Sequence, residues 1–446
     1  MLKNLLPSSE RLNKILTLGL PIIAGMMSQN IFNLVDTMMV GRLGPKELAA
    51  VGTAGMMVFT FTGFVFGVNS GVQAIAARLK GENKISEIAI ALNNGLIFSF
   101  LSSIIITIVA IAISKPMFMM LCNDTDIAKL ASDYFVIRMT VCIFAISNYA
   151  FRGYWNAIDK SKVYMSSLII MNLLNILLNY LLIFGNFGFP RLGVNGSALS
   201  TAIATVIGTS FYFFIAYKDS RQEGFLKKLP SLNEFLLLAR ISLISSSETV
   251  LTMLNCAFMY WVAGRISPFA LAGINILINM QLVVYLPAIA LGITLGSLSG
   301  QALGRGDKED AHKWGIDMLK VGTILSCMLA LPYLLFPEQI LRLFTDSQEV
   351  ISASLNSTRI MGITLGLEVL AFIFLDALKS LGYVSTPMLM MTICNWLIFA
   401  PLISALVFYF HQGLFSIWVA QSLVNFLLGY LLFSEWQKRH WQKELA

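Results

Sequence analysis

Runs of twenty or more apolar residues recur along this 446-residue chain, and few of them contain a charged residue. At 1.5 Å per residue, a helix of about 20 residues crosses the roughly 30 Å hydrocarbon core of a bilayer. Only 12% of the residues are charged and the mean hydropathy is +0.75, whereas a soluble domain carries roughly 25% charged residues. The sequence therefore predicts an all-α integral membrane protein and excludes a soluble enzyme.

Clusters of charge, glycine and proline separate twelve predicted spans. The predicted transmembrane helices are 15–40, 48–76, 86–113, 128–151, 163–185, 195–217, 235–262, 268–301, 314–336, 350–378, 388–410 and 414–434. The first run is too long for the apolar region of a cleaved signal peptide, and we interpret it as a true span. The longest connection lies in the middle of the chain. It predicts an N-lobe at 1–217, a linker at 218–234, and a C-lobe with a tail at 235–446.

Basic residues predict the orientation, because cytoplasmic loops hold an excess of Lys and Arg. The N-terminus, the even-numbered connections and the C-terminal tail hold 20 of them, and the opposite loops hold 7. Both termini and the linker are therefore predicted in the cytoplasm. The expected location is the plasma membrane, or the inner membrane in a bacterium. The net charge of +7 is explained by this orientation, and no nucleic-acid partner is expected.

An internal repeat relates the two halves of the chain. The segment GRLGPKELAAVG from Gly41 matches GRISPFALAGIN from Gly264 at an offset of 223 residues. Gly67 and Gly292 match at an offset of 225, within stretches whose small-residue spacing allows close helix packing. Because six spans per repeat is an even number, the two six-helix bundles should share one orientation and be related by an axis along the membrane normal. This is a parallel internal repeat.

Four acidic residues stand out within the predicted spans, where a carboxylate costs several kcal/mol and is a functional candidate. They are Asp36, Glu248, Glu368 and, as a weaker candidate near the cytoplasmic end of its span, Asp376. Without a fixed cation, such an acid can bind a proton, a metal cation or a cationic substrate. The alternative is a protonated or hydrogen-bonded side chain that only holds helices together.

Few basic residues are available to neutralise these acids. Arg138, in the fourth span, and Arg240, at the start of the seventh, are the candidates that we single out. Glu248 and Glu368 both fall near the middle of their spans, and we expect them jointly to form a cation site in the C-lobe. Two nearby buried carboxylates resist being ionised together, and binding Na⁺ or sharing a proton relieves that repulsion.

Cofactor chemistry has little support in the sequence. The chain has five cysteines and three histidines, with no CxxC and no HExxH motif. Four of the cysteines fall in apolar runs and are interpreted as small buried hydrophobes. We expect no cofactor, and no metal other than Na⁺ as a coupling ion.

The first span and its following loop, NLVDTMMVGRLGPKELAAVG from Asn33, resemble the opening signature of the multidrug and toxic compound extrusion (MATE) transporters. The segments ending near Gly81 and Gly306, the pair Asn172 and Asn395, and the TPM at Thr386 resemble the same family. The match covers nearly the whole chain. It implies a twelve-helix, two-lobed exporter of organic cations that is driven by inward Na⁺ or H⁺ movement.

The resemblance also implies roles for particular residues. Asp36 matches the aspartate of the N-lobe, and Glu248 matches a glutamate of the sodium-driven and eukaryotic-like branches. Glu368 stands where those branches carry an acid before an LRG-like turn, which here reads LKS. Proton-coupled relatives often have a second aspartate in span 5. This chain has Asn179 there, with Asn175 one turn earlier, and this slightly favours Na⁺ over H⁺.

These features together predict a monomeric secondary active multidrug exporter that works by alternating access between two lobes. A related flippase for amphipathic or lipid-linked cargo is the alternative. A membrane enzyme is not expected, because the spans contain no Ser/His/Asp set and no cluster of metal ligands.

Overall fold

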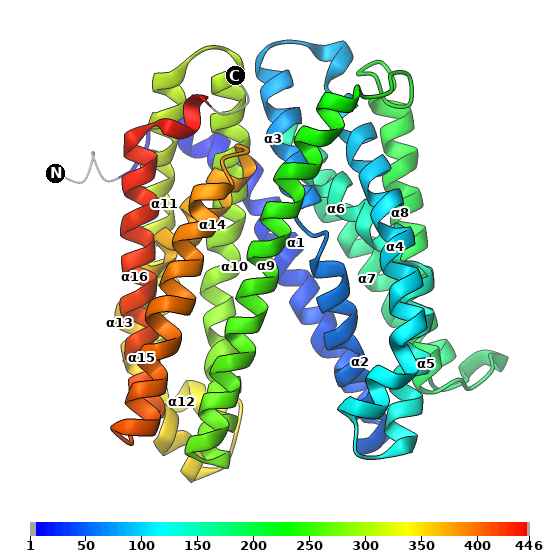
Figure 1. Ribbon diagram of the computed structural model, residues 1–446, viewed down its shortest axis with the longest axis vertical. Helices are drawn as coiled ribbons and strands as arrows, with labels where there is room; N and C mark the ends of the chain where they lie inside the picture. The colour runs from blue at the N-terminus through cyan, green and yellow to red at the C-terminus, as the bar shows by residue number, and fades with distance from the viewer. Residues whose placement is uncertain (1–5, 444–446) are drawn as a thin grey trace. The chain divides into compact units, whose positions relative to one another are not determined.

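The computed structural model describes residues 6–443, which are largely helical and include no β-strand (Figure 1). The chain divides into two compact units, named here the N-unit (Ala24–Ser246) and the C-unit (Met1–Ile23 with Ser247–Ala446). The divisions fall inside two long helices, α1 (Ser9–Gly41) and α9 (Leu232–Ile266). The first part of each of these helices therefore belongs to a different unit from the rest. The predicted lobes, at 1–217 and 235–446, have their boundary at the linker 218–234. The boundaries of the two units instead lie inside helices.

The N-unit is built from paired helices. Apart from its shares of α1 and α9, it contains α2 (Pro45–Gly63), α3 (Val68–Gly81), η2 (Ile85–Glu87), α4 (Ile90–Leu121), α5 (Thr125–Thr140), α6 (Cys142–Ala157), α7 (Ser161–Leu182), η3 (Asn186–Gly188) and α8 (Val194–Asp219). Helix α7 packs on α8, α3 on α6, and α2 on α5. Fully buried aromatic side chains, among them Phe151 and Tyr212, which stack on each other, fill the space between helices.

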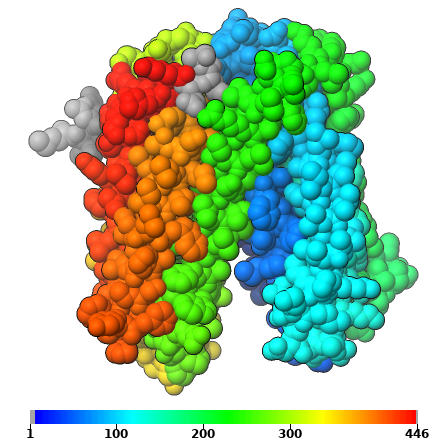
Figure 2. All heavy atoms as spheres, viewed as in Figure 1, coloured from blue at the N-terminus to red at the C-terminus, as the bar shows by residue number. Residues whose placement is uncertain are grey.

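The C-unit is centred on α13. It contains α10 (Pro268–Gly304), α11 (Lys308–Leu335), α12 (Pro337–Arg342), α13 (Gln348–Ser380), α14 (Ser385–Thr392), η4 (Ile393–Phe399), α15 (Ala400–Ser404), η5 (Ala405–Tyr409), α16 (Leu414–Lys438) and η6 (His440–Lys443). Helices α10, α11 and α16 all pack against α13. The segment from α14 to η5 and helix α16 form part of the surface of this unit in Figure 2, where they are orange and red.

Ten helices are each long and apolar enough to cross a membrane, and two bent pairs qualify as one span each. Counted in this way, the described residues contain the twelve spans that the sequence predicts. The two bent spans are the ones predicted at 48–76 and 128–151. Helices α2 and α3 meet at 41°, and α5 and α6 meet at 54°. The apolar pattern continues through both breaks, and so it did not reveal them.

The break between α2 and α3 has a local cause and a tertiary partner. The Thr62 hydroxyl donates to the carbonyl of Val58 one turn earlier, a bond that bends helices. After the break, the backbone N–H of Gly67 donates to the Ser246 hydroxyl of α9 at 2.9 Å. A Cβ at Gly67 would lie 2.1 Å from the carbonyl oxygen of Ser242, so only glycine permits this approach. Close packing at the repeated glycines is thus confirmed, since a Cβ at Gly292 would lie 2.7 Å from the carbonyl oxygen of Ile373 on α13.

The outer surface of α4 shows which solvent the fold requires. Its hydropathy is the highest of the candidate spans and only 22% of its apolar window is buried. Ile105 and Ile108, for example, are 65% and 64% exposed. A helix that is apolar on its exposed side needs a hydrocarbon solvent, because water would not tolerate so large a patch. The protein is therefore a multi-pass membrane protein.

Replacing Gly67 by alanine should destabilise the N-unit, because the new methyl group would overlap the α9 backbone. We expect a loss of about 1–3 kcal/mol in unfolding free energy. Gly52→Ala is the matched control, because a Cβ there meets nothing within 4 Å. The midpoint of thermal unfolding in detergent is measured for both variants. Equal midpoints for the two variants would contradict the close approach.

Candidate functional site

The three residues predicted for the N-lobe site, Asp36, Asn175 and Asn179, lie together in the N-unit. The Asn179 side chain of α7 donates to Asp36 Oδ1 of α1 at 2.5 Å and to Asn175 Oδ1 at 3.2 Å. Asn175 in turn donates to the hydroxyl of Thr201 on α8 at 2.9 Å. Ser197 of α8, which the sequence did not single out, lies 3.5 Å from Asp36 Oδ1. The carboxylate is held by neutral donors from two other helices.

Asp36 opens onto a cavity of about 600 Å³ inside the N-unit. This volume falls within the range of pockets that hold drug-sized ligands. The lining combines aromatic side chains, including Tyr134, Tyr149 and Tyr164, with amides such as Asn175. An adaptable aromatic wall with a few fixed polar groups suits varied amphipathic molecules.

Two arginines also line this cavity, Arg138 of α5 and Arg152 of α6. Arg138 was one of the two cations that the sequence indicated, and it lies within electrostatic range of Asp36. Arg152 was placed in a loop by the sequence pattern. The bend at Val141 separates α5 from α6, and the spans as predicted end before Arg152. The N-lobe acid is therefore not the only charge in its surroundings.

In the C-unit, Glu248 of α9 has a fixed cation that the sequence did not reveal. Lys379 Nζ lies 2.8 Å from Glu248 Oε2 and 3.0 Å from Asp376 Oδ1, and the exposed fractions of the Lys379 and Glu248 side chains are 11% and 7%. Thr252 adds a hydrogen bond of 3.2 Å to Glu248 Oε1. The sequence pattern assigned Lys379 to a cytoplasmic loop. Lys379 follows Asp376 by three residues on one helix, and this spacing was the sequence signal that could have predicted their pairing.

Glu368 of α13 occupies a different polar cluster. The Tyr285 hydroxyl of α10 donates to Glu368 Oε2 at 2.7 Å, and the amide of Asn425 on α16 donates to the same oxygen at 3.0 Å. Gln281 supports this arrangement by donating to the Tyr285 oxygen at 2.7 Å. Glu368 is only 1% exposed, and its Oε1 is buried without a hydrogen-bond partner. No Lys or Arg of the described residues lies within ion-pair distance of it.

The structure does not bring Glu248 and Glu368 together. Glu248 contacts Lys379, which stands eleven residues after Glu368 on the same helix. At 1.5 Å per residue this is a separation of about 16 Å along α13. The expected joint site, with mutual repulsion of the two acids, is replaced by one compensated glutamate and one glutamate among neutral donors.

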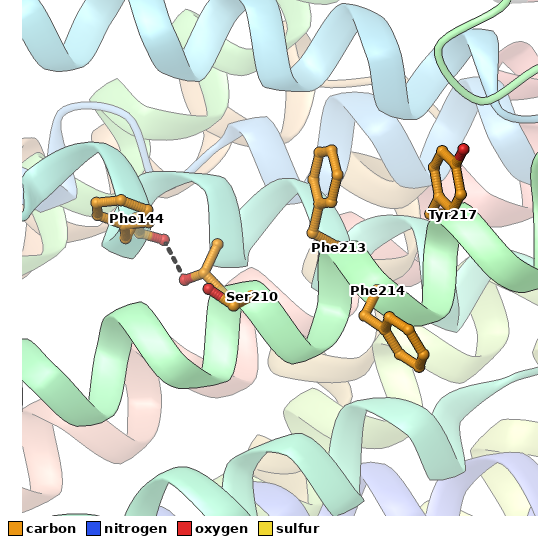
Figure 3. Close-up of a pocket in the computed structure, with 6 residues that line it drawn as sticks. Phe144, Ser210, Phe213, Phe214 and Tyr217 are labelled. Carbon is orange, nitrogen blue, oxygen red and sulfur yellow. Dashed lines mark hydrogen bonds between the residues drawn. The ribbon is translucent and has the colours of Figure 1, made fainter.

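A second hollow in the N-unit is almost wholly apolar. A groove of about 440 Å³ lies between α6 and α8 and is lined by Phe144, Phe213, Phe214 and Tyr217 together with two hydroxyl side chains (Figure 3). The one hydrogen bond drawn there runs from the Thr209 hydroxyl to the carbonyl of Phe144, at 3.2 Å. With no carboxylate, amine or guanidinium in its lining, this groove offers no charge for coupling. The cavity beside Asp36 is the better candidate site.

Replacing Lys379 by methionine should destabilise the C-unit strongly. It would leave Glu248 and Asp376 without their shared cation, and breaking a buried pair from one side costs about 3–5 kcal/mol. A second replacement, Glu248→Gln, should recover part of the loss in the double variant. Lys313→Met, at an exposed position, is the control. Chemical unfolding in detergent gives the unfolding free energy of the wild type, the Lys379→Met variant, the double variant and the control. If the Lys379→Met variant is as stable as the control, the pairing of Lys379 with Glu248 is refuted.

The chain matches the MatE family model twice, over residues 21–181 and 244–404. It is 26% identical to the "Probable multidrug resistance protein NorM" of Thermotoga maritima, over 98% of this chain and 97% of that protein. The "Multidrug resistance protein MdtK" of Yersinia enterocolitica is 25% identical over 76% of this chain and 75% of its own length. Among solved structures, an outward-facing multidrug resistance MATE family transporter of the MOP superfamily shares the fold. Its TM-score is 0.87 at 19% identity, with 97% and 96% of the two chains covered.

The two family matches are offset by 223 residues, the spacing at which the sequence repeats itself. Together they span well over half of the chain. The NorM relative is matched from end to end, and the structural neighbour confirms the fold class. Members of this family are transporters and not enzymes. With both repeats matched and the helical fold shared, the chain belongs to the MATE family of multidrug efflux transporters.

Proposed function

We propose that the protein exports organic cations in exchange for Na⁺ or H⁺, by alternating access between its two lobes. The observation that carries the proposal is Asp36, an acid of a membrane-spanning helix that lines a drug-sized cavity and is held by neutral donors. An ionised carboxylate in such a place attracts a cation, because the bilayer supplies no water to solvate it. A cationic cargo and a proton or Na⁺ are then alternative partners for the same acid.

Exchange follows if the two partners have different affinities for the inward-open and outward-open states. A ligand shifts a conformational equilibrium only by its differential affinity for the states. Asn179 and Ser197 donate hydrogen bonds to Asp36. The positive charge of Arg138, which lies within electrostatic range, weakens the pull of Asp36 on a cargo cation. The site is thus poised to release a cation and not to hold it permanently.

Within the C-unit we assign the coupling ion to Glu368. Na⁺ is a hard cation that prefers oxygen ligands, and Glu368 has Tyr285 and Asn425 beside it as neutral oxygen carriers. A proton would instead occupy the unpartnered Oε1. Glu248 is a weaker candidate than the sequence indicated, because an incoming cation would have to displace Lys379. Asp376 shares that lysine and is assigned a structural role.

The location of the protein follows from the charge pattern. We propose that both termini lie in the cytoplasm and that the transporter acts as a monomer in the plasma membrane, or in the inner membrane of a bacterium. The excess of basic residues in one set of loops supports this orientation. No cofactor is needed, since the ion gradient supplies the driving force.

The variant Asp36→Asn should export cationic dyes poorly. It keeps the shape of the side chain but removes the charge that cargo and ion compete for. A lost charge-assisted contact corresponds to a drop of about tenfold or more in efflux. Ethidium efflux from everted vesicles provides the measurement. Undiminished ethidium efflux in this variant would remove Asp36 from the mechanism.

The variant Glu368→Gln should uncouple transport from the ion gradient while leaving the protein folded, since the amide can still accept from Tyr285. Dye efflux is measured under Na⁺ and H⁺ gradients imposed separately, which also identifies the ion. Glu338→Gln is the control, because Glu338 is exposed and only pairs with Arg342 one turn later. Wild-type efflux by Glu368→Gln under both gradients would overturn the assignment.

A further inference from the structure

Arg152 is a cation in the N-unit cavity that lacks an acidic partner. Among the described residues, no carboxylate lies within 4 Å of its guanidinium. Its Nη2 faces only the thioether sulfur of Met26 at 3.7 Å, and its Nε is buried without any hydrogen-bond partner. A guanidinium carries five N–H donors and cannot lose its charge in a protein. Most of the hydrogen-bonding capacity of Arg152 is therefore unused by the protein itself.

Aromatic rings compensate this charge only in part. The guanidinium carbon lies 5.2 Å from the centre of the Tyr164 ring and 5.9 Å from that of Phe66. Phe66 in turn packs edge-on against the ring of Tyr149. Such contacts are worth about 0.5–2 kcal/mol each, less than a buried charge requires. The cage orients the guanidinium toward the cavity without replacing a counter-ion.

Arg152 stands apart from the acidic end of the cavity. It touches Met26, which precedes Asp36 by ten residues on α1, a distance of about 15 Å along the helix. Arg138, by contrast, lies near Asp36 and bonds to the Tyr134 hydroxyl at 3.1 Å. The cavity therefore has an acidic end, which Arg138 moderates, and a basic end formed by Arg152 alone.

From this geometry we infer that Arg152 binds an anionic group of the cargo, a carboxylate or sulfonate carried by an aromatic molecule. The planar fork of arginine matches the two oxygens of such a group, and the surrounding rings suit an aromatic body. This inference rests on the proposed function in taking the cavity as the cargo site.

Two dyes that differ by one ester test this assignment. Rhodamine 110 carries a free carboxylate, and rhodamine 123 is its methyl ester, with the same aromatic cation but no anionic group. Binding of each dye to the purified transporter is measured by fluorescence anisotropy. In Arg152→Gln, the affinity for the acid relative to the ester should fall about tenfold. Arg152→Lys keeps the charge but not the fork, and should lower the ratio about threefold.

Arg240→Gln is the matched control, because it removes an exposed arginine of the same unit and should leave the ratio as in the wild type. An unchanged ratio in a folded Arg152→Gln protein would overturn the inference. If that variant does not fold, Arg152→Lys decides, and a wild-type ratio there would also overturn it. Ion-driven efflux of rhodamine 123 by the wild type tests the proposed function separately. If the wild type exports rhodamine 123 but the affinity ratio does not change in Arg152→Gln, only the role of Arg152 is rejected. If the ratio changes but the wild type does not export rhodamine 123, only the exporter function is rejected.

Discussion

Inside a bilayer, a polar side chain finds no water, so the polar groups of this protein must satisfy one another. Three acids of the membrane-spanning helices do so in three different ways. Glu248 is paired with a lysine, Glu368 accepts from neutral hydroxyl and amide donors, and Asp36 accepts from Asn179 at the wall of a cavity. Only the last two arrangements leave a carboxylate without a lysine or arginine at ion-pair distance among the described residues. Lys379 is thus the reason why Glu248 differs from the other two acids.

The same constraint governs the backbone where the helices break. A break frees N–H and C=O groups that a continuous helix would pair, and these groups need new partners within the protein. At Gly67 the partner is a serine of α9, which comes close enough because glycine has no side chain. The break therefore depends on α9, and the first part of α9 is held in the N-unit. The bend at Val141 likewise sets the directions of α5 and α6, which carry Arg138 and Arg152.

A cavity with an acid at one end and an arginine at the other differs from the purely anionic cavity that uncompensated acids would create. Opposite charges at separate positions in one cavity favour molecules that carry both charges, while the aromatic lining accepts varied shapes. The cluster around Glu368 in the C-unit, in contrast, is buried and built from hydroxyl and amide groups.

The sequence by itself determined the solvent, the number of spans and the repeat. Hydropathy and a constant offset of 223 residues are properties of local stretches and need no knowledge of contacts. Asp36 stood out as a charge in an apolar run, and the resemblance to the MATE family grouped Asn175 and Asn179 with it. Only the tertiary structure decided that Lys379 neutralises Glu248, that Glu368 lies elsewhere, and that Arg152 enters the cavity. Those facts depend on which helices pack together and where they bend, and side chains far apart in the sequence meet only when those angles are set.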